Sequence, residues 1–93
     1  MSNETVEQRI AALLRETGRA HHQAFIETDG YDPAWCSWYA DYLDKRLSTL
    51  LKVRVTPGEL SDLLVKIDQE QRSQAADVNW AEYYARRLVD TYL

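Results

Sequence analysis

Apolar residues recur at intervals of three and four along most of this chain, which is the spacing of one face of an α-helix. In the first stretch they fall within an arc of roughly 120° on a helical wheel, so the pattern predicts an amphipathic helix over residues 4–28. These residues are Val6, Ile10, Leu13, Leu14, Ala24 and Phe25. Gly18 interrupts the stretch and disfavours helix by about 1 kcal/mol relative to Ala. We therefore expect a kink, or close packing against another backbone, at that position.

Turn chemistry marks the start of a second helix. Residues 28–31 read as a turn, after which Asp32 is suited to cap a helix and Pro33 to occupy its first position. This arrangement predicts a helix over residues 33–52. Its inward face contains Trp35, Tyr39, Tyr42, Leu43, Leu47 and Leu50.

Two more helices are expected in the second half of the chain. The segment Thr56-Pro57-Gly58-Glu59 has the spacing of a reciprocal capping box and predicts a helix over residues 57–72. A fourth helix is expected to open at Asp77 and to occupy residues 78–92. The chain is thus predicted to be all-α, with four helices.

A Trp- and Tyr-rich segment occurs twice. Asp32-x-x-Trp35-x-x-Trp38-Tyr39-Ala40-x-x-Leu43 and Asp77-x-x-Trp80-x-x-Tyr83-Tyr84-Ala85-x-x-Leu88 agree in residue type at every position written out. Each copy follows a helix with a Leu-Leu pair, at Leu13-Leu14 or Leu63-Leu64. The pattern predicts two helical hairpins related by an approximate internal two-fold repeat. Two copies are too few for a solenoid, which usually needs three or more.

The repeated aromatic residues divide into two groups by helical position. Trp35, Tyr39, Trp80 and Tyr84 fall on the central faces of their helices, and aromatic side chains at that spacing usually form core. The edges of the same faces carry a second pair of aromatic residues. Because Trp and Tyr are enriched at protein interfaces, we predict that this pair lies at a dimer contact or a groove rim. The pair is Trp38 and Tyr83.

Composition limits the class of protein. The 93 residues are 45% hydrophobic and 28% charged, which suits one folded domain over residues 1–93 and no second core. The net charge of -4 disfavours nucleic acid and membrane surfaces as partners. Cys36 is the single cysteine, and the first residues show neither a basic start nor an apolar signal region. We therefore expect a reducing, cytoplasmic location.

His21 is the first candidate for chemistry. Helical spacing places it on the apolar face of the first helix, either as a core histidine bonded to one acceptor or as a general base or metal ligand. With Asp29 and Asp32 it forms a possible metal-ligand set around the turn. The spacing lacks the pairs that place two ligands on one helix face. In the alternative interpretation Asp32 is a helix cap and Asp29 a turn residue.

His21 can also belong to a site that binds a small ligand rather than a metal ion. Its predicted residues are His21, Thr17, Trp35, Tyr39 and Arg46. Arg46 falls on an aromatic face, where it either packs its aliphatic stem, closes an internal ion pair, or clamps a small anion. Cys36 lies where a helix dipole favours a thiolate, but the matching residue of the repeat is Ala81, which suits a small buried filler.

Motifs with an attached activity are missing from the sequence. We find no Gly-rich phosphate loop, nucleophile elbow, Cys-x-x-Cys pair or EF-hand spacing. The sequence therefore favours a protein that works by contact rather than as an enzyme. We expect a small cytoplasmic module for protein-protein interaction or homo-oligomerisation, without a cofactor. The alternative is a small-ligand or metal-binding protein or enzyme with a site around His21 and residues 29–32.

Overall fold

A computed structural model describes residues 4–75 and 77–93 of the chain. It confirms an all-α architecture of four helices. Both ends of every helix lie within a few residues of the predicted boundaries. The helices are α1 Val6–Ala24, α2 Trp35–Leu51, α3 Pro57–Gln74 and α4 Trp80–Tyr92, and a short 3₁₀ helix spans Ile26–Thr28 after α1.

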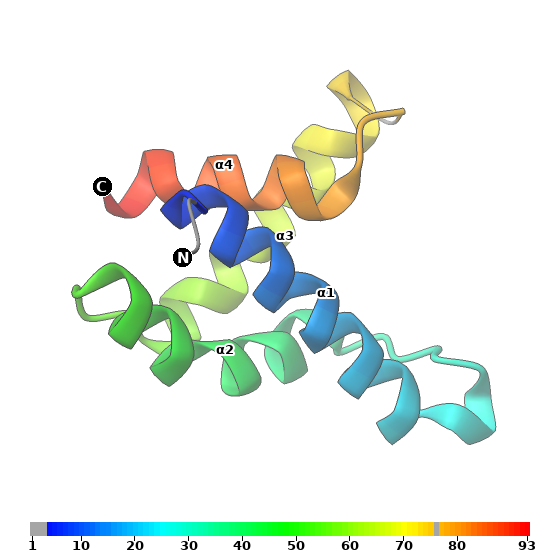
Figure 1. Ribbon diagram of the computed structural model, residues 1–93. Coiled ribbons are helices and arrows are strands. Elements are labelled where there is room, and N and C mark those ends of the chain that lie inside the picture. The colour runs from blue at the N-terminus through cyan, green and yellow to red at the C-terminus, as the bar shows by residue number, and fades with distance from the viewer. Residues whose placement is uncertain (1–3, 76) are drawn as a thin grey trace.

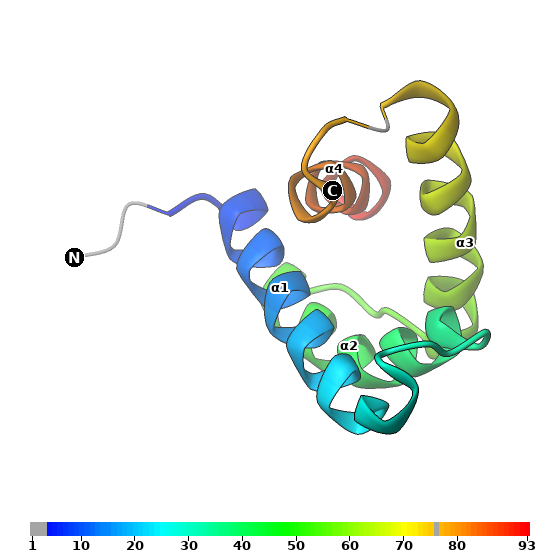
Figure 2. The same ribbon diagram turned by 90° about the vertical axis from the view of Figure 1, so that its right-hand side faces the viewer.

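The four helices form a closed ring in which each one packs mainly against two others. Figure 1 shows α2 and α4 in separate layers, with α1 crossing in front of them and α3 behind. In Figure 2, α4 is seen end on between α1 and α3. The most extensive contacts are those of α1 with α4 and of α2 with α3. The expected hairpins α1–α2 and α3–α4 are also in contact, so each hairpin packs chiefly against the other.

The reciprocal capping box lies at a helix start where the sequence did not predict it. At α1, the Thr5 side chain accepts a hydrogen bond from the Gln8 backbone N–H at 3.1 Å, and the Gln8 side chain accepts one from the Thr5 N–H at 2.8 Å. The box predicted at Thr56 is wrong, because its side chain makes no capping hydrogen bond. Pro57 still opens α3, since its fixed φ suits the first helical position.

Neither aspartate of the repeated segment is the N-cap of its helix, so the capping role predicted for Asp32 is wrong. α2 begins after Ala34, whose side chain caps nothing, while Asp32 lies further upstream and accepts the Ala34 N–H at 3.0 Å. α4 begins after Asn79, whose side chain accepts the N–H groups of the next turn at 3.1 and 3.2 Å. Asn79 therefore caps α4, two residues after Asp77, where this helix was expected to open.

The core is aliphatic rather than aromatic. Of the four aromatic side chains expected inside, only Tyr84 is buried, whereas Trp35 and Tyr39 are half-buried and Trp80 is 36% exposed. Leu and Ile fill the narrow space between the helices, and the larger rings lie around its margin. The largest fully buried side chains are Ile10, Leu14, Thr17, Leu43, Leu47, Leu60, Leu64, Ile67 and Leu88.

Gly18 lets two aromatic side chains approach α1. The helix continues through it, and a Cβ added there would lie 3.4 Å from the Tyr39 hydroxyl and 3.5 Å from the Trp80 ring. The close packing expected at this glycine is thus against side chains rather than backbone. Over the part of the chain that is described, no helix has the length and apolarity needed to cross a membrane.

Candidate functional site

A buried His–Asp pair joins the end of α1 to the segment before α2. His21 comes from the last turn of α1, and its Nε2 lies 3.0 Å from Oδ2 of Asp32. The two side chains are only 8% and 9% exposed. The other carboxylate oxygen of Asp32 accepts the Ala34 N–H. Both oxygens of Asp32 therefore have partners, and the pair fastens the α1–α2 connection onto α1.

Aromatic rings surround His21 on its remaining sides. Its ring centroid lies 4.8 Å from that of Phe25, 5.1 Å from that of Trp38 and 5.3 Å from that of Tyr39. The Trp38 contact is edge-to-face, an arrangement that aromatic pairs favour. His21 is thus enclosed by packing and bonded to one acceptor, as expected of a core histidine, while part of it still borders a cleft.

That cleft, of about 500 Å³, opens beside the pair and brings together three of the five predicted ligand residues. These three are His21, Trp35 and Tyr39, to which the predicted metal ligand Asp32 is added. Arg72 of α3 also borders the cleft, and its Nε lies 3.0 Å from Asp68. Arg72 was not predicted, because nothing in the sequence relates a residue of α3 to the α1–α2 connection. The full lining is His21, Gly30, Tyr31, Asp32, Pro33, Trp35, Tyr39 and Arg72.

Two ionisable groups near the cleft are held in their neutral forms. Burial raises the pKa of Tyr39, so its phenol stays protonated further into the alkaline range than that of an exposed tyrosine. Burial, together with the negative charge of Asp68, raises the pKa of the Cys36 thiol to about 11. A thiol that remains protonated is a poor nucleophile. The geometry therefore favours Cys36 as a packing residue and gives the cleft no activated thiolate.

The other predicted ligand and metal residues lie elsewhere. Thr17 is fully buried in α1 and donates to the Leu13 carbonyl at 2.8 Å. Arg46 borders a separate groove between α1 and α2. Asp29 has a left-handed φ of 56° and ends the 3₁₀ helix. Among the described residues, 4–75 and 77–93, no group of three or more His, Cys, Asp or Glu side chains is placed to hold a metal ion. The predicted set of His21, Asp29 and Asp32 therefore has no geometric support.

The two predicted interface residues are both half-buried. Trp38 presents its edge to His21 and stacks on Tyr42, with ring centroids 5.5 Å apart and planes 12° from parallel. Tyr83 packs against the margin of the core on α4. Trp38 is therefore continuous with a larger group of rings on the α1–α2 side of the molecule.

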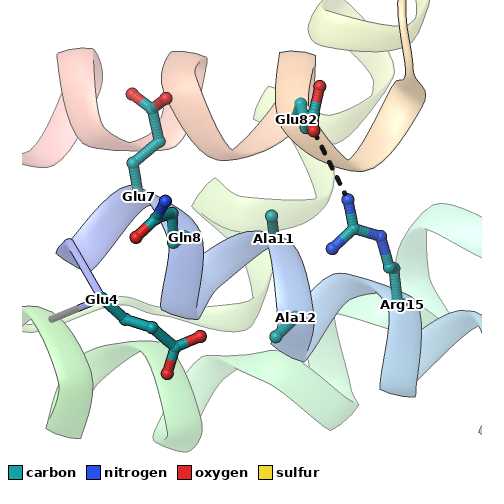
Figure 3. Close-up of a pocket in the computed structure, with 7 residues that line it drawn as sticks. All are labelled: Glu4, Glu7, Gln8, Ala11, Ala12, Arg15 and Glu82. Carbon is teal, nitrogen blue, oxygen red and sulfur yellow. Dashed lines mark ion pairs between the residues drawn. The ribbon is translucent and has the colours of Figure 1, made fainter. Parts of the chain in front are cut away.

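A second depression, of about 490 Å³, lies between α1 and α4, away from the His–Asp pair. Figure 3 shows Arg15 and Glu82 reaching toward each other across it, at 3.8 Å. Both side chains are well exposed, so their attraction is weakened by water and salt. The remaining lining residues are Glu4, Glu7, Gln8, Ala11 and Ala12. This mixture resembles an ordinary solvated helix crossing.

The chemistry of the His21 cleft is that of recognition. Aromatic walls offer stacking surfaces, and the Arg72 guanidinium offers charge-assisted hydrogen bonds to an anion. The polar pair at its base already uses both Asp32 oxygens to hold the chain in place. No protein-family model matches this chain, and neither the characterised proteins nor the solved structures compared with it include a significant match.

Proposed function

We propose that this protein is an interaction module that associates with a second copy of itself through aromatic side chains outside its core. The observation that supports the proposal is the aliphatic core itself. Of the ten aromatic residues in the chain, only Tyr84 is buried. Small domains that leave large apolar side chains at their surface commonly cover them by association.

The surface that best suits this role is the aromatic end of the α1–α2 pair, defined as Phe25, Trp38 and Tyr42. The rings contact one another or His21, with the Phe25 and Trp38 centroids 6.4 Å apart and Trp38 stacked on Tyr42. Rigid rings lose little conformational entropy on binding, which favours them as anchors. We place the contact here rather than at Tyr83, because Tyr83 has no comparable ring stack in the described part of α4.

We also infer that the two halves of the chain are related by an approximate two-fold. The Trp35–Tyr39 and Trp80–Tyr84 ring pairs support this inference, because their centroids are 5.3 and 5.7 Å apart and their planes cross at 82° and 86°. The closed ring of helix contacts also suits such a symmetry, which would exchange the α1–α4 contact with the α2–α3 contact. Under this relation Trp38 and Tyr83 are equivalent positions.

Light scattering coupled to size exclusion tests the self-association. We expect a mass twice the 10.8 kDa of the monomer at high micromolar concentration, falling toward one monomer on dilution. Trp38→Ala should shift the protein to monomer, while the matched variant Trp80→Ala should not. Thermal unfolding of both variants checks that they remain folded. A wild-type protein that stays monomeric at every concentration contradicts the proposal.

A second candidate function is the binding of a small aromatic anion in the cleft beside His21. The combination of Trp35 and Tyr39 as walls with Arg72 at the edge favours it. Benzoate is a suitable probe, and NMR should show saturable shifts of the cleft amides with benzoate but not with uncharged benzyl alcohol. Arg72→Gln should abolish the difference between the two probes. Equal, non-saturating shifts with both probes would remove this candidate.

A further inference from the structure

A second recognition surface lies toward the other end of the α1–α2 pair. We call it the cationic groove, and it is an open depression of about 650 Å³ between α1 and α2. Leu13 and Leu50 are half-buried and give it an apolar floor. Three cations border that floor, one from α1 and two from α2. The lining residues are Arg9, Leu13, Lys45, Arg46, Thr49 and Leu50.

Within the described part of the chain, none of the three groove cations forms an ion pair. The ion pairs within residues 4–75 and 77–93 are Arg15–Glu82, His21–Asp32, Arg72–Asp68 and Arg87–Glu70, and none involves a groove residue. All three side chains are solvent-exposed. In a chain with net charge -4, this is a local concentration of positive charge around apolar side chains.

Arg46 is held in place without being neutralised. Its guanidinium lies over the Tyr42 ring at 3.9 Å, and Nη1 donates to the Tyr42 carbonyl at 2.6 Å. Tyr42 is itself positioned by stacking on Trp38 and by donating to the Glu16 carboxylate at 3.2 Å. A guanidinium that is already ordered loses less entropy when it meets an anion. Arg46 is thus prepared for a negative partner.

The α3–α4 pair shows how this chain neutralises an arginine. There Arg87 binds the Glu70 carboxylate through two hydrogen bonds, of 2.8 and 3.1 Å. This interaction lowers the pKa of Glu70 and raises that of Arg87. No such carboxylate accompanies Arg9, Lys45 or Arg46 among the residues that the structure describes.

We propose that the cationic groove binds an acidic, amphipathic segment of a partner protein. An aliphatic side chain of the segment packs between Leu13 and Leu50, while its carboxylates meet Arg9, Lys45 and Arg46. The placement of cations on both sides of an apolar floor matches a helix docked in a groove, with its apolar face inward. This proposal goes beyond self-association at the aromatic end, because the residues that line the groove differ from those of that surface, and Tyr42 alone links the two by holding Arg46.

A peptide is favoured over other anionic partners by shape and charge. The groove is open, so it does not enclose a fatty-acid chain. Anionic membranes and nucleic acids attract proteins through broad positive surfaces, and a chain of net charge -4 with three cations in one groove does not offer one. A short acidic segment needs only the local match.

The test uses a fluorescent helical peptide of about 15 residues, with Leu at helical spacing among Glu and Ala. Fluorescence anisotropy should show saturable binding to the wild-type chain, and a matched peptide with Lys in place of Glu should not bind. We expect Arg46→Glu and Lys45→Glu each to weaken binding by at least about tenfold, the effect of losing one charge-assisted contact. The control Arg54→Glu makes the same charge change at an exposed residue outside the groove. It should weaken binding less than about twofold, because only screened attraction is lost.

Three results would overturn the proposal. The first is the absence of saturable binding, and the second is equal weakening by Arg46→Glu and Arg54→Glu, which indicates non-specific attraction. The third is binding to phosphatidylglycerol vesicles that depends on Arg46 and excludes the peptide, which would make the groove a membrane contact. A monomeric wild-type chain that binds the peptide leaves this proposal intact while refuting self-association.

Discussion

The α1–α2 and α3–α4 pairs each hold their interhelical connection with a side-chain hydrogen bond, but they use different polar groups to do so. In the first pair, His21 fastens the connection through Asp32, whereas in the second Gln71 does so by donating to the Val78 carbonyl at 2.9 Å. The Tyr84 hydroxyl donates to Asp68 at 3.1 Å, while Tyr39 makes no such bond within the described chain.

The difference suggests where the protein meets other molecules. In the α3–α4 pair, Arg87 binds Glu70 and the Tyr84 hydroxyl binds Asp68. The α1–α2 pair instead displays stacked rings and cations without acidic partners. Internal pairing adds stability but removes groups from recognition. We therefore expect substitutions at Glu70, Tyr84 and Arg87 to act mainly on folding, and exposed substitutions at the aromatic end and in the cationic groove to act on binding.

The largest expected effect on stability comes from removing the hydrogen bonds that hold the two interhelical connections, those of His21 with Asp32 and of Gln71 with Val78. Asp32→Ala leaves His21 buried without its acceptor and the Ala34 N–H without its turn partner, and should destabilise the fold by about 3 kcal/mol. Gln71→Ala also removes a hydrogen bond, but this bond is exposed, so its loss should cost about 1 kcal/mol. Urea unfolding of both variants measures the difference. Equal losses would mean that the two connections are energetically alike.

The next largest difference in stability is expected between alanine substitutions at Gly30 and Gly58. Gly30 has a φ of 84°, and a Cβ there would lie 2.8 Å from Nδ1 of His22, so Gly30→Ala should destabilise the protein by about 1–2 kcal/mol. At Gly58, in the first turn of α3, a Cβ meets nothing within 4 Å. Gly58→Ala should therefore be neutral or stabilise by up to about 1 kcal/mol. Opposite signs in thermal unfolding are expected, and a loss at Gly58 would contradict this account.

A smaller effect should separate Tyr39 from Tyr84, which hold matching positions in the twice-occurring sequence segment. Tyr84→Phe removes the hydrogen bond to Asp68 and should reduce the free energy of unfolding by about 1 kcal/mol. Tyr39→Phe removes a hydroxyl that lies near Gly18 but makes no hydrogen bond within residues 4–75 and 77–93, and it should change stability little. The same chemical change thus tests both halves, and a comparable loss at Tyr39 would reveal a partner that the geometry does not provide.

The last contrast is expected only at alkaline pH. Because the folded chain raises the Cys36 pKa from 9.0 to about 11, its neutral thiol favours folding below pH 9, and that contribution is lost as the pH rises through 11. Cys36→Ala, which copies Ala81 of the second half, should flatten this part of the stability curve. The tyrosines that face the same region also have raised pKa values, so the difference between wild type and variant is the quantity to measure. An identical alkaline decline in both proteins would exclude a contribution from Cys36.

Helical periodicity predicted the fold class because a 3.6-residue repeat of apolar positions is a local property. The exact helix starts were missed because they depend on individual hydrogen bonds, such as those accepted by Asn79 and by the Thr5 side chain. The burial of the rings was also misjudged. Whether Trp35 or Tyr84 is buried in the core depends on the crossing angles between the helices, and these angles cannot be predicted from helical periodicity.

The candidate site was predicted in part for the same reason. His21, Trp35 and Tyr39 are close in sequence to the α1–α2 turn, and the structure brings them to one cleft. Arg72 enters it from α3, so local sequence gave no indication of its presence. That Arg46 forms no ion pair among the described residues could not be predicted either, since it depends on every neighbour that the fold supplies.

The central claim is that the aromatic end of the α1–α2 pair is the contact surface of this module. An NMR dilution series tests it most directly, because Trp35, Trp38 and Trp80 each carry an indole N–H signal. The account predicts that the Trp38 signal moves with protein concentration while the Trp80 signal stays fixed. Signals that are all independent of concentration, or a concentration dependence confined to Trp80, would contradict it.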